Sequence, residues 1–214
     1  MKTLITFLRK RCFLHKPFSS KDYWGQRYES GRNSGPGSYG HLAEFKARVL
    51  NTFVAENNVA SIIEFGCGDG NQLTLAQYRA YIGYDVSPEI IVMCRERFRV
   101  DASKQFFHIR EHVGQKAELT ASLDVIYHLV EDDVFDEYMH RLFNASSRFV
   151  VIYSSNQDDP IEPVAAHVRH RRFSSWIDEN APHWRLVNRL PNSYPYDGNS
   201  ITTSFADFYF YEMD

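Results

Sequence analysis

The feature that most constrains the fold of this chain is a glycine-rich turn between two short apolar runs. The first run, residues 62–65, carries one acid, Glu64, and leads directly into Gly-Cys-Gly-Asp-Gly at positions 66–70. The second run, residues 81–84, is followed by Asp85. Glycines let a backbone turn tightly and approach a ligand, and a helix behind the turn points free N–H groups at that ligand. The stretch predicts a strand, a turn, a helix and a second strand, with an acid placed to bind a ribose.

Two kinds of adenosine-containing ligand use such a unit, and the spacing separates them. A dinucleotide fingerprint needs glycine at the sixth position counted from its first glycine, and Asn71 occupies that position here. Glu64 and Asp69 also place carboxylates beside the turn, where they repel a pyrophosphate and attract a sulfonium or amino group. The turn therefore favours a sulfonium ligand over a nicotinamide dinucleotide.

Residues 64–70 resemble motif I of the class I S-adenosylmethionine-dependent methyltransferases, and Asp85 resembles their acidic ribose ligand. In outline the resemblance extends over residues 23–212, and the segments GSYG, EFGCGDGNQL, DVIYHLVED and HVRHR are similar to a group of bacterial small-molecule methyltransferases. It implies a Rossmann-like α/β fold, in which helices flank a seven-stranded, mostly parallel sheet whose last strand is antiparallel.

The same resemblance implies S-adenosyl-L-methionine as the cofactor. Glu111 falls where this superfamily often places an adenine contact, although a solvated loop acid fits that position equally well. The cofactor-binding residues that the resemblance implies lie in or near the strand ends: Tyr39, Gly40, Glu64, Gly66, Cys67, Gly68, Gly70, Asp85, Val86, Glu111 and Leu123.

Composition limits the number of domains and the partners. A chain of 214 residues fits one α/β domain, which we expect over residues 22–214. The net charge of −3 provides no basic field for nucleic acid, so we expect no such partner. The three cysteines lack CxxC spacing, which predicts neither a disulfide framework nor a zinc site and favours a cytoplasmic protein.

Residues 1–21 form a basic N-terminal extension in which lysine and arginine are mixed with leucine and phenylalanine. Its longest uncharged run is too short to cross a bilayer or to act as a signal sequence. Two interpretations stay open: an extension that packs on the domain, and an amphipathic segment that makes weak contact with an anionic membrane surface.

Residues 22–40 combine glycines with large aromatic side chains, and this composition predicts a loop. Such rings have much apolar area to bury, so they either pack on the sheet edge or close over the ligands as a lid. In the second interpretation Tyr28 contacts the acceptor. The rings concerned are Tyr23, Trp24, Tyr28 and Tyr39.

The fourth strand has two possible positions, residues 118–122 or residues 125–129. The earlier position is preferred because it leaves residues 124–128 in a loop at the carboxyl end of the strand, where open α/β sheets bind ligands. Periodicity and composition predict the other elements: helices over 41–57 (with Lys46 outside), 88–98, 132–144 and 173–179, and strands over 105–109, 148–155, 184–190 and 205–212.

Two residues of this loop are candidate catalytic residues. Methyl transfer needs a general base only when the acceptor is a hydroxyl or a protonated amine, and His128 titrates in the right range. Asp124 could orient the imidazole or bind the amino group of the cofactor. A structural role remains open for both residues, with His128 as a loop histidine and Asp124 as a cap.

A basic cluster follows the fifth strand at residues 167–172. It is either a wall that recognises a phosphate, a carboxylate or a nucleotide sugar, or a solvated surface. The candidate acceptor-binding residues in it are His167, Arg169, His170 and Arg171, and no histidine spacing is completed by a carboxylate into a metal site.

These observations predict an S-adenosylmethionine-dependent methyltransferase that acts on a small anionic or sugar-like acceptor, and on oxygen if His128 is a base. Two alternatives remain, a non-catalytic S-adenosylmethionine-binding protein and an NAD-dependent oxidoreductase, which Asn71 disfavours. Methylation of nucleic-acid amines is also disfavoured, because the residues after the fourth strand lack the Asn/Asp-Pro-Pro-aromatic set that grips a planar amine.

Overall fold

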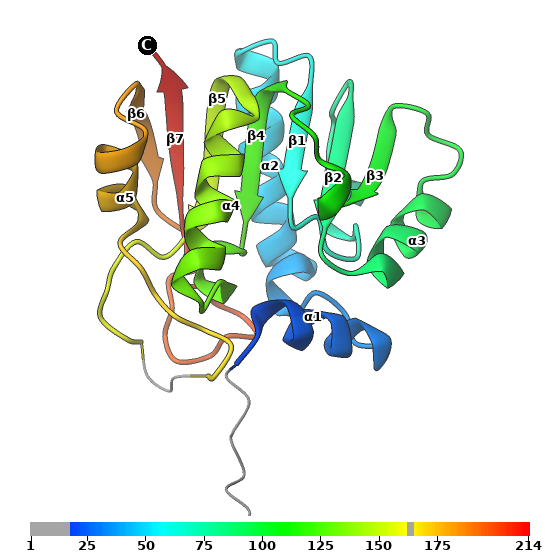
Figure 1. Ribbon diagram of the computed structural model, residues 1–214, viewed down its shortest axis with the longest axis horizontal. Coiled ribbons are helices and arrows are strands. Elements are labelled where there is room, and N and C mark those ends of the chain that lie inside the picture. The colour runs from blue at the N-terminus through cyan, green and yellow to red at the C-terminus, as the bar shows by residue number, and fades with distance from the viewer. Residues whose placement is uncertain (1–17, 162–164) are drawn as a thin grey trace, which may run out of the picture.

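The computed structural model describes residues 18–161 and 165–214, and a seven-stranded sheet forms its centre (Figure 1). The strands are β1 (Ile62–Phe65), β2 (Tyr81–Asp85), β3 (Lys104–His108), β4 (Ala117–Leu123), β5 (Ser146–Ser154), β6 (Trp184–Leu190) and β7 (Asp207–Met213). Their order is β3-β2-β1-β4-β5-β7-β6, and β7 runs antiparallel to both of its neighbours. The remaining pairs are parallel, which confirms the predicted sheet and places the carboxyl ends of β1 to β5 at one edge.

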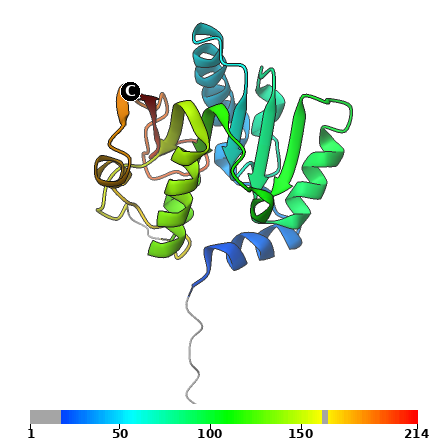
Figure 2. The ribbon, with the colours of Figure 1, turned by 45° about the horizontal axis from the view of Figure 1, so that its top comes forward.

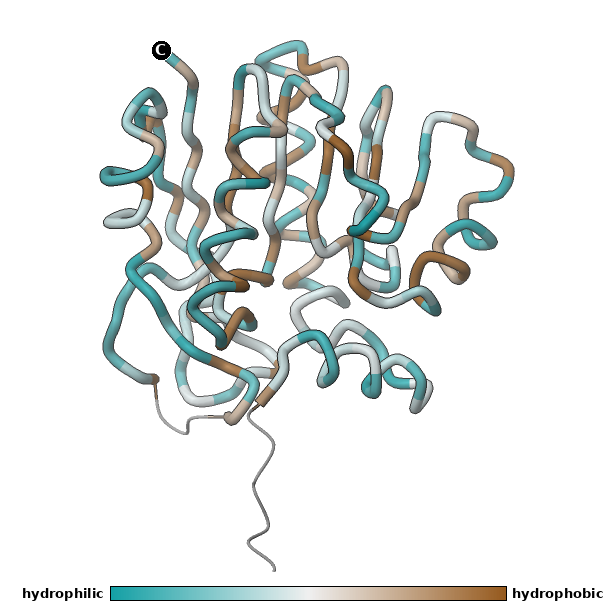
Figure 3. The backbone as a smooth tube through the Cα atoms, in the orientation of Figure 1, coloured by the Kyte–Doolittle hydropathy of each residue, from teal (hydrophilic) through white to brown (hydrophobic). Residues whose placement is uncertain are grey.

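Helices cover both faces of the sheet: α2 (Gly40–Glu56), α3 (Pro88–Arg97), α4 (Asp132–Asn144) and α5 (Phe173–Asn180). Two apolar cores result, one beneath α2 and α3 and the other beneath α4 and α5. Strand β5 contributes side chains to both cores, because alternate side chains of a strand point to opposite faces of the sheet. Val151 and Tyr153 belong to the first core, and Val150 and Ile152 to the second. Figure 3 shows the hydrophilic colours concentrated on the outer loops and turns.

An additional helix, α1 (Ser20–Glu29), corrects the prediction of a loop over residues 22–40. The side chain of Ser19 caps this helix by accepting the N–H of Asp22 at 3.1 Å. Its buried contacts come from aromatic rings rather than from a regular aliphatic stripe, so hydrophobic periodicity does not reveal it. Figures 1 and 2 show α1 lying across the edge at which the parallel strands end.

Of the basic extension expected over 1–21, residues 1–17 lie outside the described part of the chain, so the membrane interpretation is not addressed by the structure. Within 18–161 and 165–214, no helix is long and apolar enough to cross a membrane.

The helix predicted after the glycine turn is also wrong. A short 3₁₀ turn (Gln72–Leu75) follows the glycines, and the chain then runs without regular structure to β2. A side chain of α2 holds the backbone of this connection: Asn51 donates to the carbonyl oxygen of Leu75 and accepts the N–H of Gln77, both at 2.9 Å. An α-helix over residues 71–80 would use both of these backbone groups for its own hydrogen bonds.

The other elements agree closely with the predictions, with shifts of one or two residues at the ends of some strands and helices. The preferred position of the fourth strand is confirmed, since β4 ends at Leu123. Helix α4 occupies Asp132–Asn144, as the periodicity predicts. Residues 124–128 therefore lie in the turn after β4, at the same edge as the glycine turn.

Candidate functional site

The glycine turn adopts a backbone that only glycine tolerates well. Gly66, Gly68 and Gly70 have φ angles of +84°, +54° and +72°. A Cβ atom on Gly66 would lie 2.5 Å from Cγ2 of Val125, and one on Gly70 would lie 2.9 Å from Cε2 of Phe98. The turn thus packs closely against the loop after β4 on one side and against the end of α3 on the other.

Asp85 ends β2 beside this turn and is buried, with 6% of its surface exposed. Its Oδ2 accepts the N–H of Gly68 at 3.1 Å, and its Oδ1 accepts the N–H of Ser87 at 3.0 Å. Burial raises the pKa of the Asp85 carboxyl group, and the two backbone donors oppose that shift. The carboxylate is thereby fixed in direction at the strand tip.

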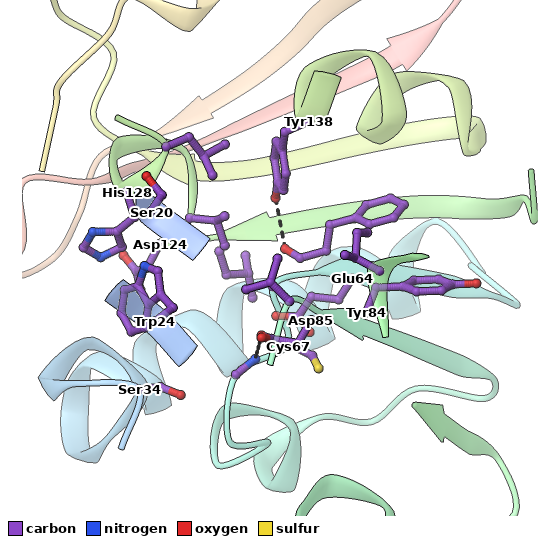
Figure 4. A pocket seen from close by; sticks show the side chains of 18 of the residues that line it. Ser20, Trp24, Ser34, Glu64, Cys67, Tyr84, Asp85, Asp124, His128 and Tyr138 are labelled. Atoms are coloured by element: carbon purple, nitrogen blue, oxygen red, sulfur yellow. Dashed lines mark hydrogen bonds between the residues drawn. The ribbon is translucent and has the colours of Figure 1, made fainter. Parts of the chain in front are cut away.

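A cavity opens at this edge of the sheet (Figure 4). Several of the expected site residues line it: Tyr28, Glu64, Gly66, Cys67, Gly68, Asp85, Val86, Leu123, Asp124 and His128. The other candidates do not line it: Tyr39, Gly40, Gly70, Glu111, His167, Arg169, His170 and Arg171. The structure thus brings together most of the expected cofactor residues and both expected catalytic residues, but leaves the basic cluster outside.

Two of the candidates outside the cavity have structural partners instead. The hydroxyl of Tyr39 donates to Asp69 Oδ2 at 2.8 Å, and Asp69 also accepts the N–H of Ser34 at 2.9 Å. Asp69 therefore joins the glycine turn to the 34–39 loop and does not line the cavity. Glu111 accepts the N–H of His108 at 2.8 Å within a capping box, so its carboxylate closes a turn after β3.

Glu64 on β1 is a buried acid at the floor of the cavity. Its Oε2 accepts the hydroxyl of Tyr81 at 2.7 Å. Burial raises the pKa of Glu64 to about 7, although Tyr81 and the nearby Lys46 favour the charged form. This carboxyl group is therefore partly protonated at neutral pH, and a cation bound nearby would ionise it.

Lys46 corrects the prediction that it lies on the outer face of its helix. Its side chain is only 2% exposed, and Nζ lies 2.6 Å from Asp124 Oδ2. The other oxygen of Asp124 accepts the hydroxyl of Tyr127 at 2.8 Å. Asp124 also has a φ angle of +60°, which is uncommon outside glycine. The residue thus forms a buried ion pair with Lys46 in a constrained turn.

His128 lines the same cavity four residues further on. Its Nδ1 lies 2.9 Å from the carbonyl oxygen of His167, so Nδ1 carries the proton and Nε2 holds the lone pair. Burial lowers the pKa of His128 to about 4, so the imidazole is neutral at pH 7. The ring of Trp24 meets it edge-on, with the ring centroids 4.8 Å apart.

Helix α1 is held over the cavity by contacts along its length. Ser20 donates its N–H to Glu131 Oε1 at 2.8 Å, and its hydroxyl donates to the other carboxylate oxygen. Tyr23 stacks on His167, with the ring planes 9° apart. Trp24 and Tyr28 both line the cavity, so these rings cover the site and are not confined to the sheet edge.

The basic cluster takes its partners from the chain itself. Arg171 Nη1 lies 2.6 Å from Asp132 Oδ1, and its Nη2 donates to the carbonyl oxygen of Val130 at 2.8 Å. Arg169 pairs with the same oxygen of Asp132 at 3.0 Å. His170 is 7% exposed, and its Nδ1 lies 2.7 Å from Ser155 Oγ. These contacts hold the 129–132 segment, and an anion-binding role of the cluster stays a prediction.

Comparisons with known proteins give a match in structure alone. No protein-family model matches the chain, and no curated protein matches it in sequence. Magnesium protoporphyrin IX methyltransferase (ChlM) from Synechocystis PCC 6803 with bound SAH is 12% identical, and the match covers 91% of this chain and 98% of that one with a TM-score of 0.66. N-methyltransferase NodS from Bradyrhizobium japonicum WM9 with S-adenosyl-L-homocysteine is 14% identical, with the same coverage and TM-score.

The methyltransferase domain of bacterial CtHen1 is 16% identical, and the match covers 81% of this chain and 99% of that one with a TM-score of 0.63. The chain has the class I methyltransferase fold. Within this fold, the glycine turn and Asp85 occupy adjacent strand ends, so the residues present fit an adenosine-containing ligand. The described residues hold no group of three or more metal-ligating side chains.

Sequence reasoning missed several polar residues of the cavity, among them Lys46 and Gln72. Gln72 donates its Nε2 to the carbonyl oxygen of Ala43 at 3.0 Å, while its Oε1 is buried without a hydrogen-bond partner. For Lys46 a signal was available, because the residue stands four positions after Leu42 and four before Leu50, a spacing that shares one helix face. No pattern marks Gln72, because its role depends on the 3₁₀ turn that replaces the expected helix.

Proposed function

We propose that the protein is an S-adenosylmethionine-dependent methyltransferase that methylates a hydroxyl group of a small acceptor. The observation that carries the proposal is that Gly66, Gly68 and the fixed carboxylate of Asp85 line one cavity. The glycine turn admits close approach of a ligand to the backbone, and Asp85 is placed to accept hydrogen bonds from a ribose. The SAH bound in the ChlM structure and the S-adenosyl-L-homocysteine bound in the NodS structure support the same ligand class here.

The buried charges of the site also support a cationic ligand. Glu64 and Asp85 are buried acids that line the cavity, whereas Lys46 is the single buried lysine or arginine in the described ranges. An excess of buried carboxylate favours a ligand with net positive charge, because opposite charges attract strongly where water is excluded. S-adenosylmethionine meets this requirement and, when bound, supplies a methyl group on a positively charged sulfur.

The role of base falls to His128. Its Nδ1–H is held by the carbonyl oxygen of His167, which leaves the lone pair of Nε2 to accept a proton from an acceptor hydroxyl. Burial lowers the pKa of His128 to about 4, below the range expected from its residue type, so the imidazole is unprotonated in the neutral range but is a weak base there. The aromatic rings of Trp24 and Tyr28 line the same cavity. The guanidinium groups of Arg169 and Arg171 have partners outside the cavity, so the proposal includes no anion site there.

Calorimetry with S-adenosylmethionine and with NAD tests the ligand class. We expect binding of the sulfonium and none of the dinucleotide, and Asp85→Ala is expected to weaken sulfonium binding by more than about tenfold, since it removes hydrogen bonds to a charged acceptor. Binding of NAD alone would replace the proposal with an oxidoreductase.

A mass-spectrometric screen of metabolite pools tests turnover and identifies the acceptor. We expect a product heavier by one methyl group in place of hydrogen, formed only with protein and S-adenosylmethionine together. His128→Ala should lower kcat by about 100-fold or more and spare cofactor affinity. Undiminished activity of that variant would remove His128 as the base, and binding without any product in the screen would favour a non-catalytic binding protein.

A further inference from the structure

Helix α1 runs along the cavity, and three contacts fix its direction. At its carboxyl end, the hydroxyl oxygen of Tyr28 lies 3.5 Å from the place of a Cβ atom on Gly68, in the glycine turn. In its middle, Trp24 meets the ring of His128 edge-on (Figure 4). At its amino end, the hydroxyl of Ser20 accepts a backbone N–H of the segment before α4 at 3.0 Å. The cavity therefore has one end at the glycine turn and an outer end at the start of α1.

Lys21 is the charged residue of this outer end. It stands three residues before Trp24, a spacing that shares one helix face and separates the two by about 4.5 Å along the axis. Both side chains line the cavity. The other lysine of the cavity, Lys46, pairs with Asp124, whereas Lys21 has no ion-pair partner among the described residues. Lys21 thus brings an exposed, unpaired cation to the outer end.

The acids that line the cavity in the described part of the chain are at the strand tips. Glu64, Asp85 and Asp124 come from β1, β2 and the loop after β4. Glu131 lies near the start of α1, but it accepts the N–H and the hydroxyl of Ser20 and does not line the cavity. Opposite charges attract and like charges repel, so an anionic group of a ligand is favoured at the outer end and disfavoured at the glycine turn.

Apolar side chains line the cavity beside His128. Leu129 and Val134 line it from the start of α4 and the segment before it, and Trp24 lines it from α1. All three are half-buried and have apolar area left to cover. A flat hydrocarbon ring covers such area without bringing polar groups that need partners of their own. The walls therefore favour an aromatic ring over a sugar.

The basicity of His128 limits the kind of hydroxyl that it can deprotonate. Burial lowers its pKa to about 4, so its lone pair is a weak base. A phenol such as the tyrosine side chain loses its proton with a pKa of about 10, far more readily than an aliphatic alcohol does. A phenolic hydroxyl is therefore the better match for this base.

We propose that the acceptor is a phenol that carries a carboxylate across the ring from its hydroxyl. The ring packs against Trp24, Leu129 and Val134, the carboxylate pairs with Lys21, and the hydroxyl faces Nε2 of His128. The transfer adds one methyl group to the phenolic oxygen, whose proton passes to Nε2 of His128, and the sulfonium becomes a neutral thioether. This inference rests on the proposed function, and it adds the class of acceptor and a residue that selects it.

Two probes of the same shape test the charge of the acceptor. 4-Hydroxybenzoate carries the carboxylate, and 4-hydroxybenzamide replaces it with an uncharged amide. Calorimetry on the full chain, saturated with S-adenosyl-L-homocysteine, measures the affinity for each. We expect the wild type to bind the carboxylate about fivefold more tightly than the amide, the ratio for one charge pair at the mouth of a cavity.

Variants of Lys21 assign this preference to one side chain. Lys21→Met should bind the two probes with equal affinity, and it should keep the wild-type affinity for the amide. Lys21→Arg keeps the charge and should keep the preference. The matched control is Lys116→Met, which removes another exposed lysine from outside this cavity and should leave both affinities unchanged. Because Lys21 is exposed, its substitution leaves the core of the fold intact.

A third probe tests the phenol. 4-Hydroxycyclohexanecarboxylate has the same charge and an aliphatic hydroxyl in place of the phenolic one. With S-adenosylmethionine, mass spectrometry should detect 4-methoxybenzoate from 4-hydroxybenzoate, and methylation of the saturated probe should be slower by about 100-fold or more. Equal rates for the two probes, or no methylated product from 4-hydroxybenzoate, would overturn the phenolic acceptor.

The remaining outcomes separate this inference from the proposed function. Equal affinity of the wild type for the carboxylate and the amide would overturn the anionic acceptor, and a preference that persists in Lys21→Met would remove Lys21 as its cause. Either result, together with binding of S-adenosylmethionine, would leave the methyltransferase proposal intact. Failure of the wild type to bind S-adenosylmethionine would remove both.

Discussion

Two sets of paired charges lie at the carboxyl edge of the sheet, and they differ in what surrounds them. Lys46 and Asp124 line the cavity, and their side chains are 2% and 17% exposed. Asp132 pairs with Arg169 and Arg171 outside the cavity and is itself 76% exposed. Water screens the charge of Asp132, whereas Lys46 acts in a low dielectric. The conspicuous run of basic residues therefore pairs with an exposed acid, while a single lysine inside an amphipathic helix reaches the cavity.

The largest expected effect comes from leaving one member of the buried pair alone. Lys46→Met should lower the free energy of unfolding by about 3 kcal/mol, because Asp124, only 17% exposed, would lose its cationic partner. Denaturant unfolding measures this change. The double variant Lys46→Met/Asp124→Asn should recover a large part of the loss, and a double variant as unstable as the single one would contradict the pairing.

At the surface set, the expected effect is smaller and confined to stability. Arg171→Ala should cost about 2 kcal/mol, since its guanidinium holds two carbonyl oxygens as well as Asp132. Arg169 is 46% exposed on its side chain, and Arg169→Ala should cost about 0.5 kcal/mol. Both variants should bind S-adenosylmethionine as the wild type does in calorimetry. A tenfold loss of affinity for S-adenosylmethionine in either variant would mean that the basic cluster contributes to the binding site.

The charge on Glu64 has an effect that appears as a dependence on pH. The pKa of Glu64 is raised from 4.5 to about 7, so the folded protein keeps a proton that the unfolded chain loses between these values. Stability from this group therefore falls as pH rises through that window, by the linkage between proton uptake and folding.

A cationic ligand favours the ionised carboxylate, so its affinity should rise with pH by at most about tenfold per unit and level off above pH 7. Calorimetry with S-adenosylmethionine between pH 5.5 and about 8.5 measures this slope, a range that brackets the shifted titration. Glu64→Gln should remove this dependence of affinity on pH. An unchanged slope in Glu64→Gln would assign the titration to another group.

Local patterns predicted most of the fold. Strand runs and the periodicity of α4 depend on near neighbours in the chain, so they were visible without a structure. The failures have causes farther along the chain. Helix α1 is stabilised by rings that meet His128 and His167, more than 100 residues away, and the connection after the glycine turn is held by Asn51 of α2.

The sequence by itself determined the ligand-facing backbone of this protein: the glycine turn, Asp85 at the tip of β2 and the loop that carries His128. These depend on glycines that tolerate the positive φ angles of the turn and on the alternation of apolar runs with polar ends, so their spacing along the chain is sufficient. Only the tertiary structure decided which charges meet. Helix periodicity gives the face on which Lys46 lies, but whether that face meets solvent or a carboxylate depends on Asp124, contributed by a loop 78 residues further along the chain. The chemistry of the cavity therefore depends on contacts between residues that lie far apart in the sequence.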